Sequence, residues 1–194
     1  MTSDSIHSPG DRSTPARARL LSAAAKLFYA EGIRAVGVDR VIDEAHVTRA
    51  TFYRHFPSKE DLICSYLQTE DERIRGLYAA GVRESKSPAE AMLKLIDGIS
   101  EQICSPGFRG CPFINAAAEY ADRKNPVHQT VIRHRKWFRD TIANSLRMAE
   151  VPDADYLADV LVALRDGAMV AGYLEDHTAA TVSFQKSARR LFGI

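Results

Sequence analysis

A short basic segment near the N-terminus carries residue types that bind the phosphates of nucleic acids. Between His46 and Lys59 the sequence has Arg49 and Arg54 and no acidic residue. The whole chain has a formal net charge of +1, so the positive charge of this segment is a local concentration. Because phosphate binding depends on such a concentration, the segment predicts a surface for nucleic acid.

The order of residue types in this segment also suits the reading of base edges. An arginine can donate two parallel hydrogen bonds to guanine, and the methyl groups of Ala50 and Thr51 can contact thymine methyl groups. Thr48 can cap a helix and offer its hydroxyl to a phosphate. The predicted DNA-contact residues are Thr48, Arg49, Ala50, Thr51, Tyr53, His55 and Lys59. Spacing alone leaves open an ordinary set of surface charges on a helical hairpin.

Three predicted helices would position these side chains. Thr14 followed by Pro15 is typical of a helix start, and Gly32 is typical of the end of that helix. Two short helices follow, joined by a turn at residues 46–48, and Pro57 prevents simple continuation of the second. Two short helices packed on a longer one indicate a helix-turn-helix, whose second helix enters the major groove.

Residues 17–64 resemble the N-terminal domain of the tetracycline-repressor (TetR) family. The resemblance rests on TFYRHFPSKEDL at residues 51–62 and on AAKLFYAEG at residues 24–32. It implies a homodimer on a near-palindromic operator, usually a repressor that a small molecule releases. It also implies that Tyr53, His55 and Lys59 contact phosphates, and that Arg49 and Thr51 lie at or near base edges.

Two positions depart from the pattern of that family. Gly37 stands where a serine or threonine commonly caps the second helix, so a hydroxyl contact to phosphate is lost. His46 stands where the turn usually has glycine, and histidine adopts a positive φ only at some cost. Neither departure changes the expected fold, and both bear on DNA affinity.

The remaining sequence predicts helices throughout, so the expected fold class is all-α with about nine helices. The expected organisation is a disordered arm at 1–13, a helix-turn-helix domain at 14–57 and a helical effector-binding and dimerisation domain at 58–194. Helix starts are expected at Ser58, at Ser87-Pro88, at Asn125-Pro126 and at Thr181. The last two helices, at about 153–174 and 181–194, would pair with their copies in a dimer.

The second domain gives less specific predictions for its own sites. Residues 110–120 resemble a segment found in one subset of the family, which suggests shared ancestry and identifies no ligand. The resemblance to the family implies that this domain holds an apolar pocket enclosed by the middle helices. Candidate pocket residues are Tyr66, Phe108, Phe113, Asn115, Glu119, Trp137, Phe138 and Arg165. Candidate dimer-interface residues are Leu161, Leu164, Val170, Leu191 and Phe192, with Gly167 and Gly172 allowing close helix approach. The alternative for both sets is ordinary packing within one protomer.

Composition limits the remaining function classes. Three cysteines and the lack of an apolar N-terminal or membrane-length segment predict a cytoplasmic protein without membrane partners. We expect no catalytic residues, metal site or cofactor, because glycine-rich phosphate loops, nucleophile elbows and zinc motifs are missing from the sequence. The favoured hypothesis is a ligand-gated repressor. The alternatives are a DNA-binding regulator that senses no small molecule and, less favoured, an enzyme on a helical bundle.

Overall fold

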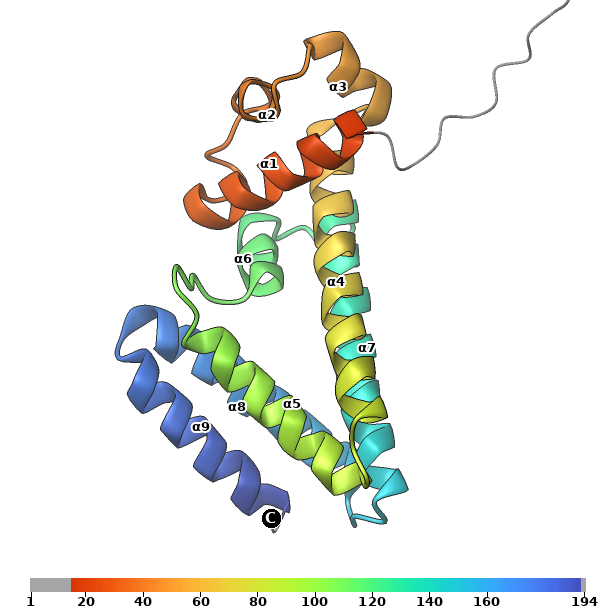
Figure 1. Cartoon of the computed structure of the whole chain (residues 1–194), viewed down its shortest axis with the longest axis vertical. Helices are drawn as coiled ribbons and strands as arrows, with labels where there is room; N and C mark the ends of the chain where they lie inside the picture. Colours follow the sequence, from red (N-terminus) through yellow and green to blue (C-terminus); the bar gives the residue numbers. More distant parts are fainter. Residues whose placement is uncertain (1–14, 193–194) are drawn as a thin grey trace, which may run out of the picture. The chain divides into compact units, whose positions relative to one another are not determined.

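The all-α fold class predicted from the sequence is confirmed by a computed structural model that describes residues 15–192 (Figure 1). The predicted arm at 1–13 and the cap at Thr14 lie outside the described residues. Within the described range the nine helices are α1 (Pro15–Glu31), α2 (Val38–Ala45), α3 (Arg49–His55), α4 (Lys59–Arg83), α5 (Pro88–Ile103), α6 (Pro112–Glu119), α7 (Pro126–Met148), α8 (Ala154–Leu174) and α9 (His177–Phe192). No helix among these residues is long and apolar enough to cross a membrane.

The chain divides into two compact units, one ending at Tyr66 and the other beginning at Leu67. The division falls inside α4, later than the boundary expected after Pro57. Its physical reason is the burial of Leu62, Ile63 and Tyr66 with the N-terminal helices. The Tyr66 ring meets the Phe28 ring of α1 edge to face, with 5.8 Å between ring centroids.

The N-terminal unit forms around one apolar stripe of α1. Leu20, Ala24, Leu27 and Phe28 recur at helical spacing along α1 and are buried. Gly32 has a φ of 95°, a left-handed conformation that glycine adopts without strain, and there α1 ends. Burial of this stripe fixes the platform on which α2 and α3 pack.

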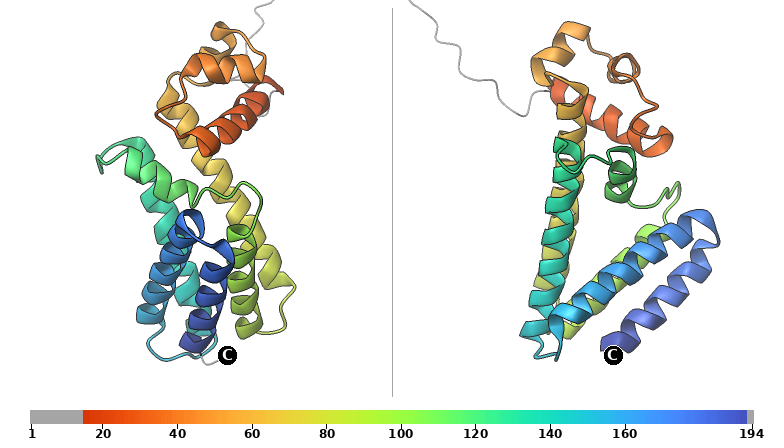
Figure 2. Two further views of the ribbon diagram at one scale, coloured as in Figure 1. Left: turned by 90° about the vertical axis from the view of Figure 1, so that its left-hand side faces the viewer. Right: turned by 180° about the vertical axis from the view of Figure 1, so that it is seen from behind.

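The C-terminal unit contains α5 to α9 and the part of α4 from Leu67 onward. Figure 2 shows α5, α8 and α9 lying alongside one another, and α7 also packs on α5 and α8. The Ser87 hydroxyl accepts from the Glu90 backbone N–H at the start of α5, and the Asn125 side chain accepts from Val127 at the start of α7. Both helix starts are where the cap-proline pairs predicted them.

The last helix begins earlier than predicted. We expected it to begin at Thr181, whereas α9 begins at His177. The carboxylate of Asp176 accepts a hydrogen bond of 2.8 Å from the Thr178 backbone N–H and so satisfies a free donor of the first turn. This earlier start makes α8 and α9 a tight helical hairpin.

Gly172 lies where α8 packs closely on α5 of the same chain. A Cβ atom at Gly172 would lie 2.4 Å from Cγ2 of Ile103 in α5. The expectation that Gly172 serves contact between protomers is therefore wrong, because Ile103 of the same chain fills the space.

Candidate nucleic-acid interface and effector cavity

The turn between α2 and α3 sets the direction of α3, the second helix of the helix-turn-helix. His46 has φ 51° and ψ 53°, the left-handed conformation expected of the glycine that it replaces. The Arg19 Nε donates to the Ala45 carbonyl oxygen at 3.1 Å and satisfies an acceptor at the end of α2. The turn is thus held by backbone geometry and by a side chain from α1.

Thr48 caps α3, as the sequence predicted. Its hydroxyl oxygen accepts from the Thr51 backbone N–H at 3.1 Å and also donates to the Thr51 hydroxyl at 2.9 Å. Gly37 precedes α2 and supplies no side-chain cap, as its lack of a hydroxyl requires. The hydroxyl of Thr48 is therefore used inside the N-terminal unit in this structure, whereas Arg49 and Ala50 are exposed at the first turn.

Arg49 pairs with an acidic residue that the sequence analysis did not consider. The Arg49 Nη2 donates to the carboxylate of Asp39 in α2, and both side chains are exposed. Asp39 lies outside the acid-free segment, ten positions before Arg49. The negative charge of Asp39 therefore lies beside Arg49, the arginine that we expect to contact base edges.

The remaining predicted DNA-contact residues lie along α3 and the start of α4. Tyr53 is exposed, and its ring rests edge-on against the buried Phe52 at a centroid distance of 5.1 Å. The pKa of His55 lies below its ordinary value, because its side chain is partly buried and the charges of Arg54 and Arg17 act on it. His55 is therefore a neutral donor at neutral pH, and the positive charge of this surface comes from Arg49, Arg54 and Lys59.

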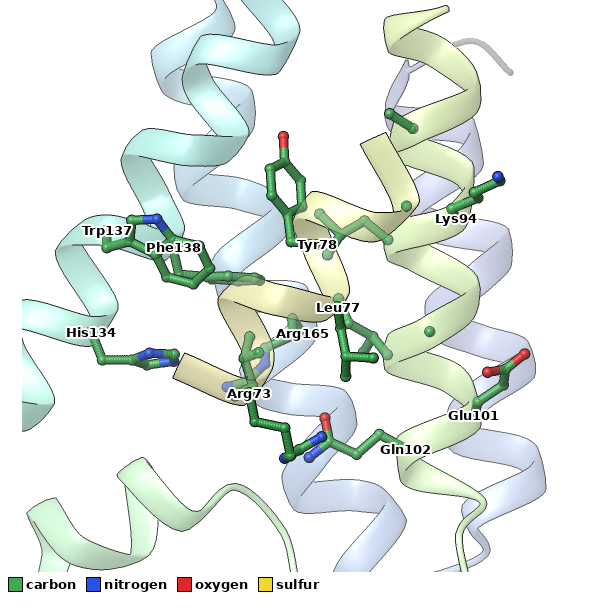
Figure 3. A pocket seen from close by; sticks show the side chains of 16 residues that line it. Arg73, Leu77, Tyr78, Lys94, Glu101, Gln102, His134, Trp137, Phe138 and Arg165 are labelled. Atoms are coloured by element: carbon green, nitrogen blue, oxygen red, sulfur yellow. The ribbon is translucent and has the colours of Figure 1, made fainter. Parts of the chain in front are cut away.

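A cavity of about 260 Å³ lies within the C-terminal unit (Figure 3). Residues of α4, α5, α7 and α8 line it, with Tyr78, Trp137 and Phe138 supplying aromatic surface. Leu77 also lines the cavity and is 62 % exposed, so the cavity opens to solvent beside α4. A concave, mostly apolar space with a few polar groups is typical of a small-molecule site.

Arg165 is the charged residue most deeply buried in this cavity, at 7 % exposure. Its Nη1 donates to Asp166 at 2.9 Å, and its Nη2 donates to the sulfur of Cys111 at 3.3 Å. Burial opposes the charge, but the contacts with Cys111 and Asp166 outweigh it and leave the pKa of Arg165 above its ordinary value. Arg165 is therefore a buried cation.

His134 forms one wall of the cavity and links α7 to α4. Its ring stacks on Phe113, with centroids 3.6 Å apart, and its Nδ1 lies 2.7 Å from Oδ1 of Asp71. Burial lowers the pKa of His134 more than Asp71 raises it, so the imidazole is neutral at neutral pH. A neutral imidazole donates from Nδ1 to Asp71, which also accepts from Arg75.

The structure places only part of the predicted pocket set around this cavity. Trp137, Phe138 and Arg165 line it, and Phe113 lies behind His134. Tyr66 belongs to the N-terminal unit, and the Asn115 amide donates to the Arg109 carbonyl oxygen instead. Phe108 and Glu119 are also outside the lining of this cavity.

The lining also includes residues that sequence reasoning missed. They come mostly from α4 and α5, and they are Arg73, Ile74, Leu77, Tyr78, Gly81, Ala91, Lys94, Leu95, Gly98, Ile99, Glu101, Gln102 and, from α7, His134. The signal available in the sequence was the aromatic Tyr78 on a long helix. Its Oη lies 2.6 Å from the Ser145 hydroxyl of α7, which fixes the ring beside Trp137.

A groove of about 470 Å³ runs between α8 and α9. Its floor consists of small and apolar residues, including Leu164, Gly167 and Phe184. Leu161 is 0 % exposed, so the expectation that it faces a second protomer is wrong: it lies on the inner stripe of α8. Val170 is exposed, and Leu191 and Phe192 are partly exposed.

The described residues contain no group of three histidine, cysteine or acidic side chains that could hold a metal ion. The three cysteines are free, and Cys111 is buried against Arg165.

Models of known protein families match both units of the chain. A family model described as bacterial regulatory proteins of the tetR family matches residues 20–65. A second model, described as a tetracyclin repressor-like C-terminal domain, matches residues 88–188. The two matches fall on the helix-turn-helix and on the helices around the cavity.

Individual relatives and solved structures extend the similarity over most of the chain. The chain is 28% identical to the HTH-type transcriptional regulator LmrA of Bacillus subtilis over 133 residues, which are 68% of this chain and 71% of LmrA. It is 26% identical to TtgR of Pseudomonas putida over 164 residues, 78% and 77% of the two chains.

A solved structure, SCO4454 of Streptomyces coelicolor, is a TetR-family transcriptional regulator. It superposes with a TM-score of 0.90 at 44% identity and covers 94% of this chain and 96% of that one. All these relatives are regulators, as the sequence analysis expected in preference to an enzyme. This chain therefore belongs to the TetR family of helix-turn-helix transcriptional regulators.

Proposed function

We propose that this regulator is a homodimeric repressor that a small-molecule effector releases from a near-palindromic operator. One observation carries the proposal: the chain that bears the helix-turn-helix also contains a cavity with aromatic walls and a buried cation. A regulator that senses no small molecule would be expected to have a filled C-terminal core instead.

In this proposal α3 lies in the major groove and Arg49, Ala50 and Thr51 reach base edges from its first turn. Tyr53, His55 and Lys59 contact phosphates, as does the first turn of α4 through its backbone N–H groups. Release of Arg49 from Asp39 accompanies binding, because the guanidinium cannot hold guanine and the carboxylate with the same donors.

The dimer would form through α8 and α9. The groove between them is lined by small residues, so the helices of a second protomer can approach closely. Two copies of α3 would then read two half-sites about one helical turn apart. We expect α4 to couple effector binding in the cavity to DNA binding, because this helix starts in the N-terminal unit and lines the cavity further along.

Selection of bound sequences from random duplex DNA, followed by salt titration of the selected duplex, tests the proposal. We expect a near-palindrome and a steep fall of affinity with salt concentration. Absence of an enriched sequence would reject operator binding. Unchanged operator affinity across a broad screen of compounds that bind near Trp137 would reject release by an effector.

A further inference from the structure

The guanidinium of Arg165 has hydrogen-bonding capacity that the protein does not use. Its Nε is buried and has no hydrogen-bond partner, a condition found for no other buried side-chain nitrogen or oxygen in the described part of the chain. A buried donor without a partner costs free energy, and the cost is larger for a charged group. Arg165 also lines the cavity, so its side chain borders the space that a bound molecule would occupy.

The charge of Arg165 is only partly balanced as well. Its carboxylate partner, Asp166, also accepts a hydrogen bond of 2.6 Å from Arg135, so two guanidinium groups share one carboxylate. Glu101 lines the cavity from α5 but forms no ion pair with Arg165 within the described residues. The neighbouring His134 is neutral, so one positive charge beside the cavity lacks a carboxylate. A buried charge in that condition is strongly stabilised by an anion.

Other lining residues define the shape of the occupant. Arg73 and Lys94 also line the cavity (Figure 3). Each forms an ion pair with a glutamate, Glu70 and Glu84 respectively, so the incompletely balanced cation of the lining is Arg165. Trp137 and Phe138 present ring surface, and the Arg165 guanidinium lies 5.6 Å from the centroid of Phe138. At about 260 Å³ the cavity is smaller than the ~300–1,000 Å³ typical of ligand pockets. The space therefore suits a small, flat, apolar group.

We propose that the effector is a small aromatic carboxylate whose oxygens accept hydrogen bonds from Arg165, Nε included, while its ring packs on Trp137 and Phe138. The inference rests on the proposed function, because it names the ligand class of the same cavity. Carboxylate and guanidinium form paired, charge-assisted hydrogen bonds, so the anion supplies both the missing acceptor and the missing charge.

The single tryptophan of the chain makes the test direct. Trp137 is that tryptophan and it lines the cavity, so its fluorescence reports occupancy of this site. The probes are benzoate and phenylacetate, each against its neutral amide of the same shape. We expect the carboxylates to bind the full-length protein at least about tenfold more tightly than the amides, the size expected for a hydrogen bond to a charged group.

Three variants test whether Arg165 causes the preference for carboxylate over amide. Arg165→Met should abolish the discrimination between carboxylate and amide, and Arg165→Lys should retain only part of it. Arg147→Met removes the same charge from α7 outside the cavity lining and should leave it unchanged. The comparison of carboxylate with amide uses the unmodified chain, so it holds even where a variant at Arg165 folds poorly.

Equal affinity for acid and amide, or carboxylates that fail to change Trp137 fluorescence up to their solubility limit, would overturn the proposal. Operator release measured in parallel separates it from the proposed function. Neutral compounds that bind at Trp137 and release DNA would overturn the anionic class alone. Carboxylates that bind through Arg165 without changing operator affinity would support the anion site and reject effector-gated repression.

Discussion

At the scale of single residues, the pairing of Arg49 with Asp39 sets the charge that α3 offers to DNA. A count along residues 46–59 gives three basic residues and no acid, but the fold brings Asp39 of α2 against the first arginine. Exposed ion pairs contribute little to stability, about 1 kcal/mol or less. The main effect of Asp39 is therefore on the electrostatics of the DNA-facing surface.

Asp39→Asn should strengthen binding to random duplex DNA by several-fold at low salt, because it removes a negative charge and frees Arg49. Fluorescence anisotropy over a range of salt concentrations measures the change. Asp43→Asn is the matched control, since Asp43 is an exposed acid of the same helix without a recorded ion pair to Arg49. Equal effects of the two variants would contradict a specific role for the Asp39–Arg49 pair.

His134 illustrates a residue whose role depends on its surroundings. It lies in a run of basic residues at 133–136, yet its side chain is buried between Phe113 and Asp71. No periodicity identifies this contact, because Asp71 is 63 positions away. Burial makes the neutral form of His134 the stable one.

Protonation of His134 should therefore destabilise the C-terminal unit. Its folded pKa lies below the ordinary value of 6.5, so the unfolded chain binds the proton more readily, and stability should fall as pH drops below about 6.5. Thermal unfolding between pH 8 and pH 5 should show this loss in the unmodified chain and a smaller one in His134→Gln. His128→Gln is the control, and a pH dependence unchanged in His134→Gln would contradict the prediction.

At the scale of elements, local signals predicted the helices well and their contacts poorly. Thr48, Ser87 and Asn125 cap helices where the sequence placed them, since a cap acts within a few residues. The Asp176 cap was overlooked, so α9 was expected to begin too late. The cavity was predicted only in part, because α4 gives no strong stripe from which to tell that Tyr78 and Leu77 border a space between helices.

The contact between α8 and α5 gives a prediction for packing. Gly172→Ala should lower the free energy of unfolding by about 1–3 kcal/mol, because the new methyl group would overlap Cγ2 of Ile103, a branched atom that cannot swing away. Urea denaturation measures the change. Gly76→Ala adds the same group to α4, where nothing lies within 4 Å, and should be neutral or stabilising. Equal stability of both variants would contradict this packing.

At the scale of the whole molecule, α8 separates two surfaces with different uses. One stripe, with Ala158, Leu161 and Ala168, is buried within the protomer, and another, with Leu164 and Gly167, lines the groove beside α9. The sequence predicted an apolar helix but could not assign its faces, so Leu161 was placed on the wrong one. The groove is the surface of this hairpin that we propose for contact with a second copy of the chain.

Gly167→Glu should convert the protein into a folded monomer. The added side chain meets nothing within its own protomer, so the fold should be retained, whereas a carboxylate in the proposed dimer interface would be buried without a partner. Light scattering after size-exclusion chromatography measures the oligomeric state, and operator affinity should fall about a thousandfold, towards non-specific binding. Gly76→Glu adds the same charge at an equally open position of α4 and should stay dimeric. A Gly167→Glu protein that remains a dimer with full operator affinity would place the interface on another surface, and the small residues of the groove would then need a different explanation.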